Sequence, residues 1–387
     1  MSRGRIASIK IGRVPKNEDI VVRKGTLAPA LINSHDHLKY TWPAHIGQPP
    51  YEDSLEWLPS LYTVAQREFL NRINLSDLYW LGTYKCILSA VATVANHCKR
   101  LSGEFLRQFP IRILDQFARE IFVRFDDRAH QMGRGPKEEI ELASRRKLPF
   151  VVHIAEGLNH GTECEIDLLE GLGGLSDRAV LVHALNLSDQ DIGKIRLANA
   201  SVVWCPVSNR FLFERTARVP DFLNAGINVA LGTDSTCTGS EGLLDEMRAA
   251  TEELHKMSMA KAEEKVFGFV TANAARAFGK SAEIGQITSG ASADFLLFET
   301  GENDPTIGLL NLRPGDILLL TCAGKWLVGE NQFTAKLPCA SPSQTEVAIG
   351  GLKRDIAGKP LEVLRRVTTA SGHDFEFFPL GRTVHEL

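Results

Sequence analysis

The stretch LAPALINSHDH, residues 27–37, is a short apolar run that ends in two histidines. Because successive side chains of a strand point to opposite faces, His35 and His37 are predicted to face the same way. Further apolar runs follow along the chain, and longer amphipathic segments separate them. This alternation is typical of a parallel α/β fold. Seven more strands are predicted, at residues 90–97, 110–116, 120–125, 148–154, 179–184, 200–206 and 227–233.

Eight strands favour a closed (β/α)₈ TIM barrel over an open sheet. Helices are predicted at residues 188–197, 243–256 and 260–278; the first has Ser188 as N-cap and Asp191 in its first turn, where an acidic side chain suits the helix dipole. Residues 115–136 leave little room for the fourth unit of the barrel.

The barrel is predicted to span residues 28–282, and strand-like runs occur on both sides of it. Residues 6–11 and 19–23 precede it; broken strands and a helix at 353–367 follow it. Each set is too small to be stable alone. Residues 1–27 and 283–387, the latter including a tail, are therefore predicted to form one small β-sandwich domain.

Composition argues against several classes of protein. The formal charge of −3 gives no case for binding nucleic acid or an anionic membrane. No run approaches the roughly 20 apolar residues of a membrane span, and the N-terminus lacks a signal-peptide pattern, so a cytoplasmic location is predicted. The seven cysteines are scattered without a CxxC pair, which argues against a disulfide framework or a cysteine-rich zinc knuckle.

Four predicted strands end in, or are directly followed by, a histidine or an aspartate. His35 and His37 end the first strand, His153 the fifth and His183 the sixth, and Asp234 follows the eighth. Each has an ordinary alternative, such as a surface pair, a core histidine bonded to backbone, or a helix cap. Together they fall at the rim where barrel enzymes assemble their active sites. Burying so many polar groups there without a metal or mutual hydrogen bonds would be costly.

The motifs HDH, HIAEG, HALNLSD, WCPVSN and GTDS, in this order and each closing a strand, resemble the amidohydrolase superfamily. The similarity is greatest to its cytosine/guanine/S-adenosylhomocysteine deaminase and chlorohydrolase branch. NAARAFG followed by EIGQITSGASADFLLFE also resembles that branch's passage into a small β domain. The resemblance runs from about Gly25 to about Gly329, and its motifs specify the superfamily far better than a substrate.

The resemblance implies that His35, His37, His153 and Asp234 hold one divalent metal ion. Zinc is preferred for this ligand set, with iron and manganese as alternatives. Relatives with two metals use a carboxylated lysine on the fourth strand, and no lysine ends that strand here. A single metal is therefore predicted.

The resemblance also assigns catalytic roles. Glu156 would shuttle a proton to the substrate, and His183 would bond the attacking water or the atom under attack. Asp234 would accept the proton of the metal-activated water. The predicted reaction is hydrolysis of a C–N bond, preferably deamination of a cyclic amidine in a planar nitrogen heterocycle.

Two alternatives remain open. One is hydrolysis of an amide, or of a halide, on a similar ring. The other is a metal-binding protein that binds a ligand without catalysis; such a protein should have lost Glu156, His183 or Asp234, and all three are present.

Substrate contacts are predicted from position alone. Ser208 and Asn209 follow the seventh strand, His97 ends the second, and Trp42 lies on a loop near the same rim. For Trp42, ordinary loop packing is the competing interpretation. Relatives of this branch often form dimers, so the resemblance allows a homodimer.

Overall fold

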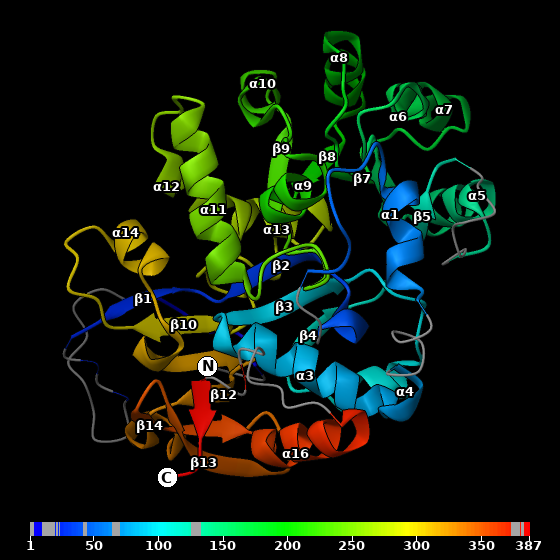
Figure 1. Ribbon diagram of the computed structural model, residues 1–387. Coiled ribbons are helices and arrows are strands. Elements are labelled where there is room, and N and C mark those ends of the chain that lie inside the picture. The colour runs from blue at the N-terminus through cyan, green and yellow to red at the C-terminus, as the bar shows by residue number, and fades with distance from the viewer. Residues whose placement is uncertain are drawn as a thin grey trace.

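The computed structural model describes residues 4–9, 20, 22, 24–41, 45–63, 70–124, 133–372, 380 and 383–387. Eight parallel strands form its centre and belong to two sheets (Figure 1). All eight predicted strands are present, with ends shifted by a few residues. The three-stranded sheet contains β2 (Leu31–Asp36), β3 (Val91–Asn96) and β4 (Arg112–Leu114). The five-stranded sheet contains β5 (Ala118–Phe122), β6 (Phe150–Ile154), β7 (Ala179–His183), β8 (Ser201–Trp204) and β9 (Asn228–Leu231).

Both faces of these strands are covered. Every residue of β2, β3 and β5–β9 is buried, as expected for near-continuous apolar runs in a parallel sheet. One apolar cluster draws on both sheets, so they share a core on one face. Its strand members are Ile32, Ala95, Val151, Val180, Val182, Val203 and Ala230.

The two sheets meet at two places. Only residues 115–117 join β4 to β5, so the fourth unit lacks the helix expected between consecutive parallel strands. At the other junction the Asp234 amide, just past β9, donates to the His35 carbonyl at 3.1 Å. A Cβ at Gly232 would lie 2.8 Å from the His35 nitrogen, so glycine is required for this approach.

Helices surround the parallel strands (Figure 1). The predicted cap of α8 is confirmed: Ser188 and Asp191 form a reciprocal capping box. The predicted single helix 260–278 is wrong, because Thr271 leaves helical geometry and divides it into two. After β8 the helices are α9 (Pro206–Phe213), α10 (Val219–Asn224), α11 (Leu243–Lys256), α12 (Ala262–Phe269) and α13 (Ala272–Ala277). Earlier come η1 (Leu38–Tyr40), α1 (Ser54–Leu61), α3 (Leu75–Leu88), α4 (Gly103–Leu106), α5 (Pro136–Arg146), α6 (His160–Glu163), α7 (Glu165–Gly171) and α8 (Asp189–Ala198).

A seven-stranded antiparallel sheet lies beside the parallel strands and joins segments far apart in sequence (Figure 1). Its order is β1 (Thr26–Pro29), β10 (Phe295–Phe298), β11 (Ile317–Cys322), β12 (Lys325–Gly329), β14 (Leu352–Ala357), β13 (Gln344–Ile349) and β15 (Val384–His385). The remaining helices are α14 (Pro305–Leu310), η2 (Pro314–Asp316), α15 (Asn331–Thr334) and α16 (Pro360–Ser371).

Two predictions for the chain ends are corrected. Residues 6–9 form no strand, and the backbone of Arg5 forms an isolated bridge to Ser292; most of the predicted strand 19–23 lies outside the described residues. The predicted helix 353–367 is wrong at its start, because those residues pair with β13 as β14. α16 follows and packs on α3, where Arg366 Nη2 lies 2.6 Å from Asp77 Oδ1. Among the described residues, no helix is long and apolar enough to cross a bilayer.

Candidate active site

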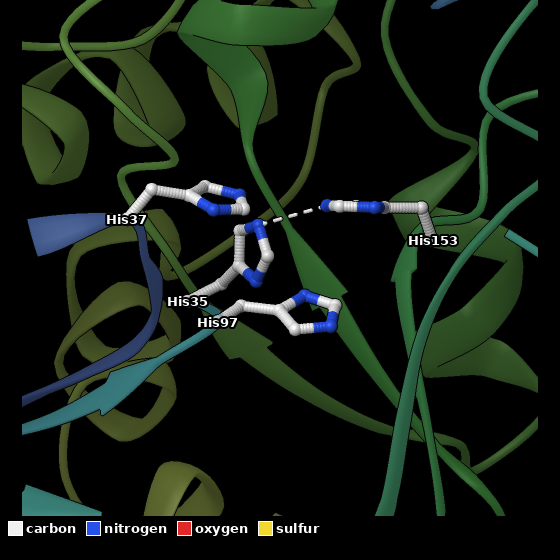
Figure 2. A group of neighbouring side chains, drawn as sticks. All are labelled: His35, His37, His97 and His153. Carbon is white, nitrogen blue, oxygen red and sulfur yellow. Dashed lines mark hydrogen bonds between the residues drawn. The ribbon is translucent and has the colours of Figure 1, made fainter. Parts of the chain in front are cut away.

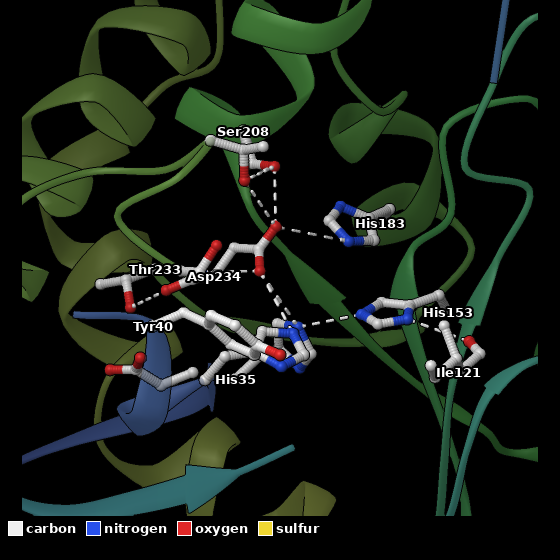
Figure 3. A network of polar contacts seen from close by, with 12 residues as sticks. His35, Tyr40, Ile121, His153, His183, Ser208, Thr233 and Asp234 are labelled. Atoms are coloured by element: carbon white, nitrogen blue, oxygen red, sulfur yellow. Dashed lines mark hydrogen bonds and ion pairs between the residues drawn. The ribbon is translucent and has the colours of Figure 1, made fainter. Parts of the chain in front are cut away.

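The carboxyl ends of the parallel strands bring the predicted metal ligands together (Figures 2 and 3). His35 and His37 come from the end of β2, His153 from β6, and Asp234 follows β9. His153 Nε2 lies 3.1 Å from His35 Nε2. Asp234 Oδ1 lies 3.3 Å from His37 Nε2 and 3.7 Å from His35 Nε2. Four side chains separated by up to about two hundred residues therefore converge on one buried point.

The protonation of these groups suits a cation. His153 Nδ1 donates to the Ile121 carbonyl at 2.9 Å, which leaves the lone pair on Nε2 facing His35. Burial lowers the pKa of His35 to about 4 and also lowers the pKa values of His37 and His153. Neutral imidazoles are the form that binds metals. The three imidazoles and the Asp234 carboxylate fit a divalent metal ion.

Asp234 is fixed by the residues around it. Ser208 and Thr238 hydroxyls donate to Oδ2 at 2.8 and 3.0 Å, and the Ser235 amide donates to Oδ1 at 2.7 Å. Burial alone would raise the pKa of Asp234, but the hydrogen bond and charge of the histidines, His35 foremost, hold it well below its usual range. The residue sits at φ 58°, a left-handed conformation uncommon outside glycine. Its carboxylate is therefore ionised and aimed at the cluster.

His183 and Glu156 stand next to this cluster. His183 Nδ1 donates to Asn209 Oδ1 at 2.8 Å, so its Nε2 carries the lone pair. That Nε2 lies 3.4 Å from Glu156 Oε1 and 4.0 Å from Asp234 Oδ2. Burial raises the pKa of Glu156 to about 7, with Asp234 adding to the rise and His183 opposing it. Glu156 is thus poised to hold or release a proton near neutral pH.

A pocket of about 80 Å³ opens beside these groups. Its polar wall includes His37, His153, Glu156 and Asp234, and its other walls are mainly apolar and aromatic. A mainly apolar lining with a few convergent polar groups is typical of a small-molecule site. A larger depression of about 490 Å³ lies near the start of β4 and contains none of the candidate site residues. The remaining lining residues of the smaller pocket are Tyr40, Ser54, Trp57, Leu58, Leu61, Tyr62, Ile121, Phe122 and Ser235.

Three of the four predicted substrate contacts, His97, Ser208 and Asn209, do not line this pocket. Ser208 bonds Asp234, and Asn209 bonds His183, so both hold catalytic candidates. His97 is fully buried. Trp42 lies outside the described residues.

A buried ion pair beneath the histidines was missed from the sequence. Lys85 Nζ on α3 lies 2.9 and 2.8 Å from the two oxygens of Asp36, the residue between His35 and His37. Both side chains are essentially inaccessible. The available signal was a single lysine within the apolar helical segment GTYKCIL. The aromatic side of the pocket, formed by Trp57 and its neighbours on α1, was also missed.

Comparison with known proteins places the chain in a family. The model of the amidohydrolase family matches residues 135–327. The 5-methylthioadenosine/S-adenosylhomocysteine deaminase of Pyrococcus abyssi is 32% identical over 82% of this chain and 86% of its own. The chain belongs to the amidohydrolase family. It is a metal-dependent hydrolase that acts on C–N bonds, of the deaminase and chlorohydrolase branch.

A second curated protein and one solved structure are also similar to this chain. The 8-oxoguanine deaminase of Pseudomonas aeruginosa is 22% identical over 78% of this amidohydrolase and 81% of its own chain. The zinc complex of atrazine chlorohydrolase from Arthrobacter aurescens superposes with a TM-score of 0.69 at 18% identity, over 90% of this chain and 89% of its own. At that identity the superposition shows a shared fold.

Proposed function

We propose that this amidohydrolase is a mononuclear aminohydrolase that releases ammonia from an aminated, planar nitrogen heterocycle. The observation that carries the proposal is the position of Glu156 beside both His183 and Asp234, at the wall of a mainly apolar pocket. Amide hydrolysis has less need of a proton carrier facing a ring nitrogen. The deaminases among the relatives support a purine-like ring as the first candidate.

His35, His37, His153 and Asp234 would hold one ion, with zinc preferred and iron or manganese as alternatives. When bound there, such an ion supplies Lewis acidity that brings the pKa of water close to neutrality. The zinc complex of a protein with the same fold supports this choice.

The chain's own groups would divide the proton transfers. The Asp234 carboxylate accepts a proton from the attacking water, while Glu156 donates its proton to the ring nitrogen next to the attacked carbon. A C–O bond forms, and the C–N bond to the exocyclic amine breaks. The proton held by Asp234 then passes to the amine, which leaves as ammonia, while the proton of the added hydroxyl returns to Glu156 as the carbonyl forms. His183 Nε2 lies 3.4 Å from Glu156 Oε1, from which its lone pair can take up a proton, and as an imidazolium it would steady the negative charge that develops.

The aromatic lining of the pocket supports the same substrate class. Trp57 is fixed by its Nε1, which donates to the Ile46 carbonyl at 2.8 Å. Tyr40, Tyr62 and Phe122 provide further aromatic walls. Flat apolar walls favour a planar ring and exclude water from the reacting groups.

We also propose a closed (β/α)₈ barrel over residues 28–282, with residues 1–27 and 283–387 in a small β-sandwich domain. The core shared by the two parallel sheets and the bond between the Asp234 amide and the His35 carbonyl support closure. The pairing of β1 with β10 supports a domain built from both chain ends. A cytoplasmic location and a homodimer stay predictions.

The test is a screen of the zinc-loaded full chain against aminated purines, pyrimidines, pterins and triazines, read by ammonia release. Chlorinated rings of the same kinds are tested in parallel by measuring chloride release, because halide is the alternative leaving group. Ammonia release that is lost in Asp234→Asn supports the proposal. Chloride release without ammonia release favours the halide alternative, and no turnover in either arm by metal-loaded protein favours a non-catalytic binder.

A further inference from the structure

His97 is a buried imidazole that the proposed mechanism does not use. Its side chain has no exposed surface, and neither ring nitrogen has a hydrogen-bond partner among the described residues. A neutral imidazole carries one donor and one acceptor, and leaving both unpaired in a buried position is unfavourable. The position therefore calls for a partner that accepts a nitrogen lone pair.

The surroundings of the ring identify that partner. The His97 ring centroid lies 4.8 Å from that of His153, 5.1 Å from that of His35 and 5.7 Å from that of His37 (Figure 2). One nitrogen from each of these four histidines falls within 4.8 Å of the other three. Four imidazoles that converge on one point form a nitrogen-rich metal site.

The backbone of His97 is fixed on both sides. Its amide donates to the carbonyl of Asp36 at 2.7 Å, which ties the end of β3 to the residue between the two β2 histidines. Arg119, which is almost fully buried, donates through Nη1 to the carbonyls of Asn96 and Cys98 at 3.0 and 2.9 Å. Both neighbours of His97 are thus bonded to one guanidinium, and the imidazole is held in place before any ligand binds.

We propose that His97 is a further ligand of the metal, so that four imidazoles rather than three surround the ion together with Asp234. This inference rests on the metal site of the proposed function. The pocket wall includes His37 and His153 but neither His35 nor His97. His97 therefore binds from the buried side, away from the substrate. An imidazole-rich set also favours zinc over manganese, which prefers oxygen ligands.

X-ray absorption at the zinc edge of the full chain counts the imidazoles directly, through scattering from the ring carbons. We expect four in the unaltered protein and three in His97→Phe. The matched control is Phe117→Leu, because that ring packs 6.4 Å from the His97 ring and offers no donor atom. We expect the control to keep four imidazoles.

Zinc affinity, measured by competition with a chromophoric chelator, gives an independent readout. Loss of an outer-shell partner typically weakens metal binding roughly 10–100-fold, so we expect at least that loss in His97→Phe and in His97→Gln, and little change in Phe117→Leu. The preference for zinc over manganese should fall in the same two His97 variants.

Each outcome separates this inference from the proposed function. Three imidazoles in the unaltered protein would overturn the role of His97 and leave the hydrolase proposal intact, and this measurement decides even if the His97 variants do not fold. Unchanged zinc affinity in folded His97 variants would also overturn the role of His97 as a ligand. Four imidazoles without turnover of any substrate would contradict only the proposed function.

Discussion

Glu156 sets the pH dependence expected of this enzyme at the residue scale. As the acid that protonates the ring, it must carry its proton, and burial raises its pKa to about 7. The protonated fraction falls as pH rises, so kcat/KM for ammonia release should decline above about pH 7. Glu156→Gln keeps the shape but cannot pass a proton, and we expect a loss of roughly 10²–10⁴-fold. A glutamine variant with full activity, or with the same alkaline decline, would contradict this role.

Lys85 and Asp36 offer a second residue-scale prediction, because their ion pair is buried beneath the histidines. Lys85→Met leaves the Asp36 charge unpaired, and we expect a loss of about 3–5 kcal/mol in the free energy of unfolding. Adding Asp36→Asn removes that charge and should recover part of the loss. Urea unfolding of the two single variants and the double variant measures the coupling. Strictly additive losses in the free energy of unfolding would show that Lys85 and Asp36 are not coupled.

A surface pair provides the control for that cycle. Lys24 lies 2.9 Å from Glu299, and its side chain is 81% exposed. Exposed pairs of this kind contribute little, so Lys24→Met should change stability by less than about 1 kcal/mol. A comparable loss of stability in Lys24→Met and Lys85→Met would mean that burial does not explain the effect of Lys85→Met.

At the scale of elements, the close packing of α3 on η1 positions the end of β2. A Cβ at Gly82 of α3 would lie 2.8 Å from Leu38 Cδ2 and 3.0 Å from the Leu38 carbonyl oxygen. Leu38 is the residue that directly follows His37. Although alanine favours helix, overpacking should dominate, so Gly82→Ala should cost about 1–2 kcal/mol of stability. Because η1 follows a metal ligand, zinc affinity should fall as well.

Gly193 on α8 is the matched control, since a Cβ there meets no atom within 4 Å. The same change should stabilise the protein by up to about 1 kcal/mol through helix propensity alone. Denaturant unfolding of both variants tests the comparison. If Gly82→Ala raises the free energy of unfolding as much as Gly193→Ala does, α3 and η1 can move apart without cost. Close packing of α3 on η1 would then not limit stability.

For the whole molecule, metal binding should be coupled to stability, because the ligands come from strands of both parallel sheets. Zinc at about 100 times its dissociation constant adds roughly 2.7 kcal/mol to the native state. We therefore expect chelation to lower Tm and zinc to restore it, as calorimetry would measure. Magnesium, which prefers oxygen ligands, should restore far less. An unchanged Tm after verified metal removal would contradict a site that joins the two sheets.

Local sequence determined much of this protein. Apolar runs of strand length indicated all eight parallel strands, since burial on both faces needs continuous apolar side chains. The polar residues that end them indicated the site, and the capping box of Ser188 and Asp191 indicated the start of α8. These features depend on residues a few positions apart, which is why a pattern can carry them.

Tertiary structure decided what each polar group touches. Ser208 and Asn209 reach Asp234 and His183 across 26 residues each, so they hold catalytic candidates rather than line the pocket. Lys85 meets Asp36 across 49 residues because α3 packs against η1 and β3. Such pairings depend on sheet register and helix packing, and no short-range pattern encodes them. The sequence therefore specified which chemistry is present, while the packing of distant elements assigned each side chain its partner.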